Sequence, residues 1–132
     1  MLQSLELRDL YLGDQQLLIP DTLIKIDVAS VKVTGGISLQ NCTQLQSLKL
    51  HGLDIGDQQL LLPDTLTYIW VEHVKVTGGI YLQNCSQLQT IKLMLVKNGD
   101  NQLNLTDRLT HIHMIDMNLS RGFAELYINL DP

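Results

Sequence analysis

Apolar residues recur along this chain at an interval that alternates between 21 and 22 residues. In the first five units, apolar side chains occupy positions 1, 4, 6 and 9, counted from the leucine that opens each unit. Positions 4 and 6 of an extended chain point to one side, and positions 3, 5 and 7 point to the other. The pattern therefore predicts a strand over positions 3 to 7 with one buried face. The six units open at Leu2, Leu23, Leu45, Leu66, Leu88 and Leu109.

The second half of each unit comes in two alternating forms. Odd units carry GDQQLLIPDTL (13–23), GDQQLLLPDTL (56–66) and a degraded GDNQLNLTDRL (99–109). Even units carry TGGISLQNCTQL (34–45) and TGGIYLQNCSQL (77–88). The Gly-Asp and Gly-Gly pairs predict turns, and the alternation in QLLLP and GIYLQ predicts short second strands. Neither form contains a helix-length stretch with a 3.6-residue period.

These features predict an all-β solenoid of six coils in one domain over 1–132. A parallel front sheet would be backed by short second strands or turns, with neighbouring coils about 4.8 Å apart. The last unit becomes irregular after Leu119, and we expect residues 120–132 to contribute a C-terminal cap.

The arrangement resembles the leucine-rich repeat family, whose consensus LxxLxLxxNxL recurs every 20 to 29 residues. LPDTLTYI is similar to the LPxxLxxL segment of bacterial effector repeats, and LQNCSQLQTI is similar to the CxxLxxI segment of cysteine-containing and BspA-like repeats. The resemblance implies a leucine-rich repeat solenoid with a concave front sheet. The chain departs from the family at position 9, where the family asparagine is replaced by Leu10, Val31, Leu53, Val74, Val96 and Met117.

Two long copies of the sequence, 2–44 and 45–87, differ at 13 of 43 positions. Nine of the differences fall at front or flanking positions, while VKVTGGI and QNC are kept. One interpretation is that stacking fixes the loops and leaves the front free to drift. The other is that the front is a diversified contact surface, as in variable immune-type leucine-rich repeat receptors, which the pattern resembles. We adopt the second and predict a non-catalytic module, of an immune-type or effector protein, that binds a protein partner.

The predicted contact residues are Lys25, Asp27, Lys49, His51, Tyr68, Trp70, Glu72, Lys92, Met94, His111 and His113. Trp70 is the only tryptophan, and a central Trp beside a Tyr is typical of an interface hot spot. Its register also places it between two lysines, so an internally satisfied cation–π stack is the alternative.

His111-x-His113 places two imidazoles on one strand face, with Asp116 nearby. No cysteine or third convergent carboxylate is indicated there, so we predict no metal and no cofactor.

Several function classes are disfavoured by composition and motifs. The net charge of −5 argues against nonspecific nucleic-acid binding. No uncharged apolar run approaches the roughly 20 residues that span a bilayer. No nucleophile–base pattern, P-loop or GxGxxG is present, and TGG is a turn that no helix follows. We predict no enzyme activity.

The two cysteines, Cys42 and Cys85, occupy equivalent positions two coils apart. Stacking would separate them by about 9.6 Å, which is too far for a disulfide, so we predict buried free thiols. Together with the absence of a visible signal peptide, this favours a cytoplasmic over a secreted protein. Four N-x-S/T matches, at Asn41, Asn84, Asn104 and Asn118, point the other way.

The first repeat begins at Leu2 without a preceding cap. The chain could be a piece of a longer receptor or effector, or its open edge could pair with another copy. Self-association through this N-terminal edge defines an alternative function, a structural or self-assembling scaffold. The similarity of the copies is also compatible with an engineered repeat array.

Overall fold

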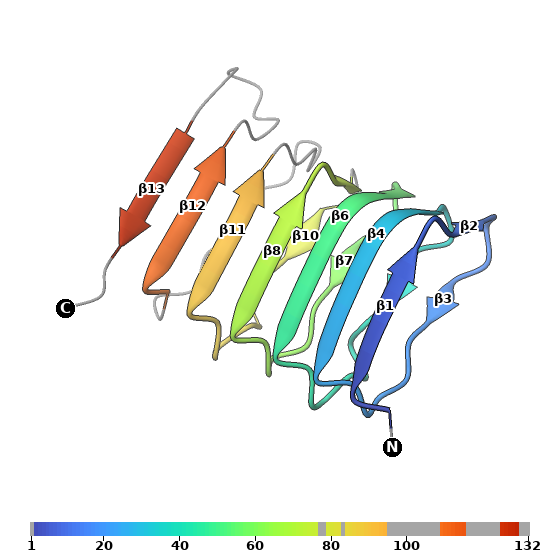
Figure 1. The fold of residues 1–132 in the computed structure, drawn as a ribbon, viewed down its shortest axis with the longest axis horizontal. Coiled ribbons are helices and arrows are strands. Elements are labelled where there is room, and N and C mark those ends of the chain that lie inside the picture. Colours follow the sequence, from blue (N-terminus) through green and yellow to red (C-terminus); the bar gives the residue numbers. More distant parts are fainter. Residues whose placement is uncertain (1, 77–78, 83, 95–108, 116–124, 130–132) are drawn as a thin grey trace.

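The part of the chain that the structure describes contains β-strands joined by turns and loops, and no helix. The computed structural model describes residues 2–76, 79–82, 84–94, 109–115 and 125–129. The chain winds as stacked coils, each with a strand on the front and a return segment behind (Figure 1). Four coils have described strands on both sides. The predicted all-β solenoid with a parallel sheet is confirmed.

Front strands from successive coils form one large sheet in which neighbours are parallel. These strands are β1 (Ser4–Arg8), β4 (Lys25–Val33), β6 (Ser47–Gly56), β8 (Tyr68–Glu72), β11 (Thr90–Met94) and β12 (His111–Ile115). Each residue pairs with the residue at the same unit position of the next coil, as Lys49 does with Trp70. The last strand, β13 (Glu125–Asn129), is antiparallel to β12. It lies within the predicted cap segment, whose remaining residues are outside the described ranges.

The predicted front strand of five residues matches β1, β8, β11 and β12 and is too short for β4 and β6. β4 and β6 continue to Val33 and Gly56, where they pair with the short strands β2 (Tyr11–Leu12) and β9 (Lys75–Val76). The β2–β4 pairing keeps equivalent unit positions opposite each other, whereas the β6–β9 pairing shifts register between Asp54 and Gly56.

The back of the solenoid carries short strands, as the alternating segments predicted. They are β3 (Leu17–Leu18), β5 (Ile37–Ser38), β7 (Leu60–Leu61) and β10 (Ile80–Tyr81). These strands form two separate parallel pairs, β3 with β5 and β7 with β10, so the described back is not one continuous sheet. Each pair joins an odd coil to the following even coil, which matches the 43-residue repeat.

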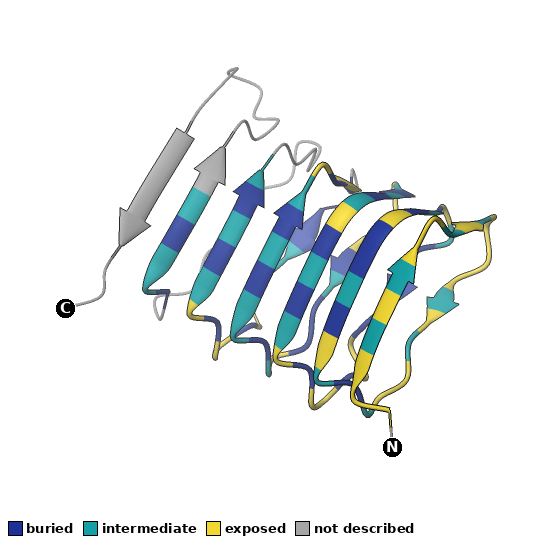
Figure 2. Ribbon diagram, in the orientation of Figure 1, coloured by how far each residue is buried: buried dark blue, intermediate teal, exposed yellow. Residues whose placement is uncertain are grey.

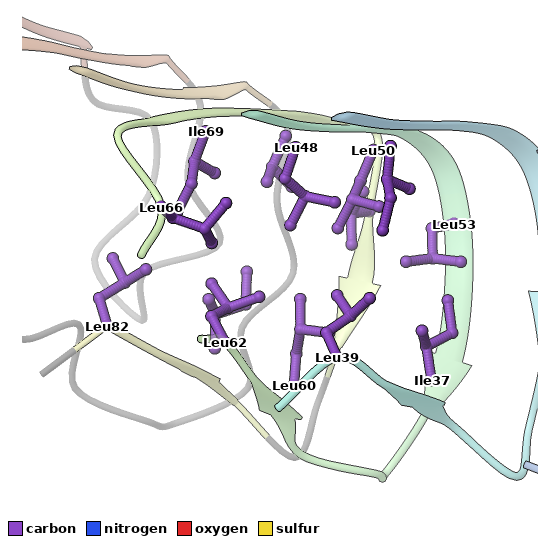
Figure 3. Packing of buried hydrophobic residues seen from close by; sticks show 14 of the residues in the cluster. Ile37, Leu39, Leu48, Leu50, Leu53, Leu60, Leu62, Leu66, Ile69 and Leu82 are labelled. Atoms are coloured by element: carbon purple, nitrogen blue, oxygen red, sulfur yellow. The ribbon is translucent and has the colours of Figure 1, made fainter. Parts of the chain in front are cut away.

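The core lies between the front strands and the back segments. Buried and partly exposed residues alternate along the front strands (Figure 2). Leu48, Leu50 and Ile69 point inward from the front toward side chains such as Leu60 and Leu82 from the back (Figure 3). Each such leucine contributes about 1.5–3 kcal/mol on burial.

The residue at unit position 8 bends the chain, directly after β1 and β8 and within β4 and β6. The backbone there is left-handed in all four coils, with φ of 56° at Asp9, 57° at Ser30, 66° at Gly52 and 52° at His73. The N–H of Asp9 donates to the carbonyl oxygen of Ala29 in the next coil at 3.1 Å, and the turn therefore keeps the coils linked.

At position 9, where the leucine-rich repeat consensus has asparagine, three of the described coils carry a buried apolar residue. Val31, Leu53 and Val74 are each 1% exposed. Backbone groups take over the polar linkage between coils, because the N–H of Lys32 donates to the carbonyl oxygen of Leu10 at 3.0 Å.

Side chains of the segments that are identical in both internal copies also link the coils. The hydroxyl of Thr65 donates to the carbonyl oxygen of Leu45 at 2.6 Å, and Thr22 donates to Leu2 at the same distance. In the even coils, the thiol of Cys85 donates to the carbonyl oxygen of Pro63 at 3.6 Å. The PDT and NC segments therefore have structural roles.

Both cysteines are buried and free, as predicted. Burial raises the pKa of the Cys85 thiol to about 11 and also raises the pKa of the Cys42 thiol. Both thiols are consequently protonated near neutral pH and act as small apolar groups with a weak donor.

Gly35, in the conserved TGG turn, lies directly against the preceding coil. A Cβ at this position would overlap the carbonyl oxygen of Asp14 and lie 2.5 Å from the carbonyl carbon of Gln15. The glycine therefore allows two turns to approach closely. This contact accounts for the glycine without a role in phosphate binding.

We predict that Gly35→Ala lowers the free energy of unfolding by about 1–3 kcal/mol, since backbone atoms must move to admit the methyl group. Urea denaturation followed by circular dichroism measures the change. Gly13→Ala is the matched control, because nothing lies within 4 Å of its Cβ, and its effect should stay within about 0.5 kcal/mol. Equal denaturation midpoints for the two variants would contradict the prediction.

Candidate functional site

The front face consists of the outward side chains at unit positions 3, 5 and 7 of the front strands. The observed register places the predicted contact residues in three columns. The position-3 column contains Lys25, Tyr68 and His111, the position-5 column contains Asp27, Lys49, Trp70, Lys92 and His113, and the position-7 column contains His51, Glu72 and Met94. The structure therefore brings all the predicted residues onto one face, as neighbours along or between columns.

Trp70 lies at the middle of the position-5 column, between two lysines. The ammonium group of Lys49 is 5.3 Å from the indole centroid, and that of Lys92 is 5.4 Å from it. Both distances fit cation–π contacts. The lysines come from β6 and β11, the strands on either side of β8, so the in-register pairing creates the stack. The Lys49–Trp70–Lys92 cation–π stack, which the sequence analysis gave as the alternative to an interface hot spot, is thus present.

The indole N–H of Trp70 is buried and has no hydrogen-bond partner among the described residues. A buried unpaired donor costs about 1–3 kcal/mol. Trp70 is only partly exposed, so a binding partner would meet the ring together with its two lysines. The candidate anchor is therefore the unit of Lys49, Trp70 and Lys92.

A hollow of about 370 Å³ lies beside this unit and extends from Arg8 on β1 to Glu72 on β8. Ala29 and Leu50 line the hollow and are only 8% and 1% exposed. The small side chain of Ala29 leaves space between its column neighbours Arg8 and His51. Sequence reasoning placed Ala29 in the outward column but did not select it, although its replacement by Glu72 in the second copy indicated that the position matters.

A second hollow, of about 250 Å³, lies toward the C-terminal end of the front face. Tyr68, Lys92, His111 and His113 line it, so these predicted residues share one surface depression. The nearby Asp116, which the sequence suggested as a companion to the two histidines, is outside the described residues.

Three groups able to bind a metal converge elsewhere on the front face. Their ligand atoms, on His51, Glu72 and His73, lie within 4.8 Å of one another. Sequence reasoning selected His51 and Glu72 as contact residues; it counted His73 among the flanking residues that differ between the copies but did not select it, because position 8 follows the predicted strand. The difference between Ser30 and His73 was the available signal, and the left-handed turn at position 8 is what brings His73 to its neighbours.

Comparisons with protein-family models, with curated proteins and with solved structures found no match. Within the described residues, no helix has the length and apolar character needed to cross a membrane.

We predict a coupling free energy of about 0.5–1 kcal/mol between Lys49 and Trp70, the size of an exposed cation–π contact. It is measured by urea unfolding of Lys49→Gln, Trp70→Leu and the double variant. Lys25→Gln removes an equal charge from the same face, and Lys25 makes no cation–π contact in the described structure. Its coupling to Trp70→Leu should stay below about 0.3 kcal/mol, and equal couplings for the two lysines would refute the stack as a stabilising contact.

Proposed function

We propose that this chain is a leucine-rich repeat module of six coils that binds a protein partner through its front face, without catalysis. The repeat length, the LxxLxL spacing and one parallel front strand per unit support the family assignment. The apolar column at position 9 is the main departure, and backbone bonds between coils supply the linkage there.

The observation that carries the proposal is the character of the residues that differ between the two copies. Stacking contacts account for the constancy of Gly35, Thr65 and Cys85, so constancy alone does not indicate binding. On the front face, however, the second copy carries Trp70 where the first copy carries Asp27, and the indole N–H of Trp70 is buried without a hydrogen-bond partner among the described residues. A residue retained only for scaffold stability would avoid that cost.

The surface has the features of a protein-binding patch. The Lys49–Trp70–Lys92 unit supplies large amphipathic area with two positive charges, which suits an acidic or carbonyl-rich segment of the partner. The adjacent hollow, with Ala29 and Leu50 in its lining, can receive one side chain of the partner. Trp and its surrounding contacts are expected to provide most of the binding free energy.

We expect a variant with Tyr68→Lys, Trp70→Asp and Glu72→Ala to lose its partner. These substitutions introduce the residue types of the equivalent positions in the first copy, Lys25, Asp27 and Ala29. The same backbone already carries those residues 43 positions earlier. Affinity capture with the wild-type chain identifies the partner, and titration then gives the dissociation constants. Trp70→Ala alone should weaken binding by about 2 kcal/mol or more.

Tyr81→Ser is the matched control, because it is the one non-conservative copy difference that lies on the back. It should bind as the wild type does. A loss of binding free energy below about 0.5 kcal/mol for Trp70→Ala would falsify the role of Trp70. Equal losses in the front-face variant and in Tyr81→Ser would exclude the front face as the binding surface.

Self-association is the second candidate function, and the exposed apolar residues of the first coil favour it. Leu2, Tyr11 and Leu18 are 51%, 78% and 73% exposed, and β1 is an edge strand of the front sheet. Open edges and apolar patches promote association between copies.

If self-association operates, light scattering will show oligomers whose mass falls toward the monomer in Leu18→Glu, which replaces an exposed apolar side chain of the first coil with a charged one. Leu61→Glu changes the equivalent residue of the next 43-residue copy, inside the array, and should not alter the association. A monodisperse monomer at high protein concentration rejects this alternative.

A further inference from the structure

We propose that His51, Glu72 and His73 form a binding site for a divalent transition-metal ion of the zinc type at the edge of the front face. His51 on β6 pairs directly with Glu72 on β8, and His73 follows Glu72 in the chain. The Nε2 atom of His73 is 3.8 Å from a carboxylate oxygen of Glu72. The imidazole rings of His51 and His73 have centroids 5.6 Å apart and an interplanar angle of 73°.

The ligand chemistry fits zinc better than calcium or magnesium. Two imidazoles and one carboxylate form a ligand set found in open zinc sites, whereas hard cations prefer oxygen ligands alone. Zinc bonds of about 2.0–2.2 Å place tetrahedral ligands roughly 3.3–3.5 Å apart. The three ligand atoms already lie within 4.8 Å of one another, so a small side-chain rotation completes the site.

The side chains have the freedom to make that rotation, since both histidines are exposed and Glu72 is partly exposed. The backbone around them is fixed by the in-register strands and by a 3.0 Å hydrogen bond from the N–H of His73 to the carbonyl oxygen of Met94. Three protein ligands leave a fourth tetrahedral position for water or for a group from another molecule.

The repeat supplies an internal comparison for this site. One copy earlier, the equivalent residues are Arg8, Ala29 and Ser30. Arginine is not deprotonated in proteins, alanine has no donor atom, and a serine hydroxyl is not among the usual zinc ligands. The same backbone geometry therefore occurs twice, and only the second copy carries a complete ligand set. All three ligands arose at positions where the copies differ.

The experiment is isothermal titration of the whole untagged chain with zinc chloride alone. We expect saturable binding of one ion per chain, with the imidazole NMR signals of His51 and His73 shifting ahead of those of His111 and His113. The variant His51→Arg, Glu72→Ala, His73→Ser installs the first-copy residues and should bind zinc at least about tenfold more weakly, a loss seen even when an outer-shell partner is removed.

His111→Thr is the matched control, because it removes a front-face histidine outside the site and installs the type of its column neighbour Thr90. It should bind zinc as the wild type does. Glu72→Ala alone serves as a second test if the triple variant fails to fold. The proposal is overturned by the absence of saturable binding, by undiminished binding in the triple or Glu72→Ala variant, or by a loss that follows His111→Thr instead. Because zinc is the only ligand added, this result is independent of whether the front face binds a protein.

Discussion

In-register hydrogen bonding between successive coils is the constraint on which the rest of the structure depends. Every front strand pairs with the next at the same unit position, from Ser4 opposite Lys25 to Thr90 opposite His111. A shift by one residue would turn the apolar positions 4 and 6 toward solvent. The repeat therefore converts a one-dimensional pattern into columns of equivalent positions, with positions 4 and 6 pointing to the core and positions 3, 5 and 7 pointing outward.

The segments that stay the same between the two internal copies are explained by the same constraint. Gly35 has no room for a side chain because the preceding turn presses against it, while Thr65 and Cys85 satisfy carbonyl groups of neighbouring segments. Position 8 is left-handed in each of the four coils with described fronts and backs, and the N–H groups of Asp9 and His73 still donate to carbonyl oxygens of the next coil. These demands come from stacking, and they leave the outward positions of the front strands free to vary.

The front face depends on pairs of neighbouring coils, not on any one unit. Trp70 is bracketed by Lys49 and Lys92 because each lies at position 5 of an adjacent coil. The hollow beside it exists because Ala29 is small and its column neighbours are large. His51, Glu72 and His73 converge because a left-handed turn places a position-8 residue beside two position-7 residues. Both the proposed protein contact and the proposed metal site arise from such lateral relations.

The sequence by itself determined the unit boundaries, the buried columns, the outward columns and the free buried cysteines, because side-chain alternation and a repeat length that varies by only one residue leave one consistent register. It also identified Lys49, Trp70 and Lys92 as neighbours. Only the tertiary structure decided that the back strands form separate pairs, that β4 and β6 run beyond position 7, and that His73 joins His51 and Glu72. These features depend on backbone dihedral angles at turns and on contacts between coils, which a pattern of apolar and polar letters does not encode.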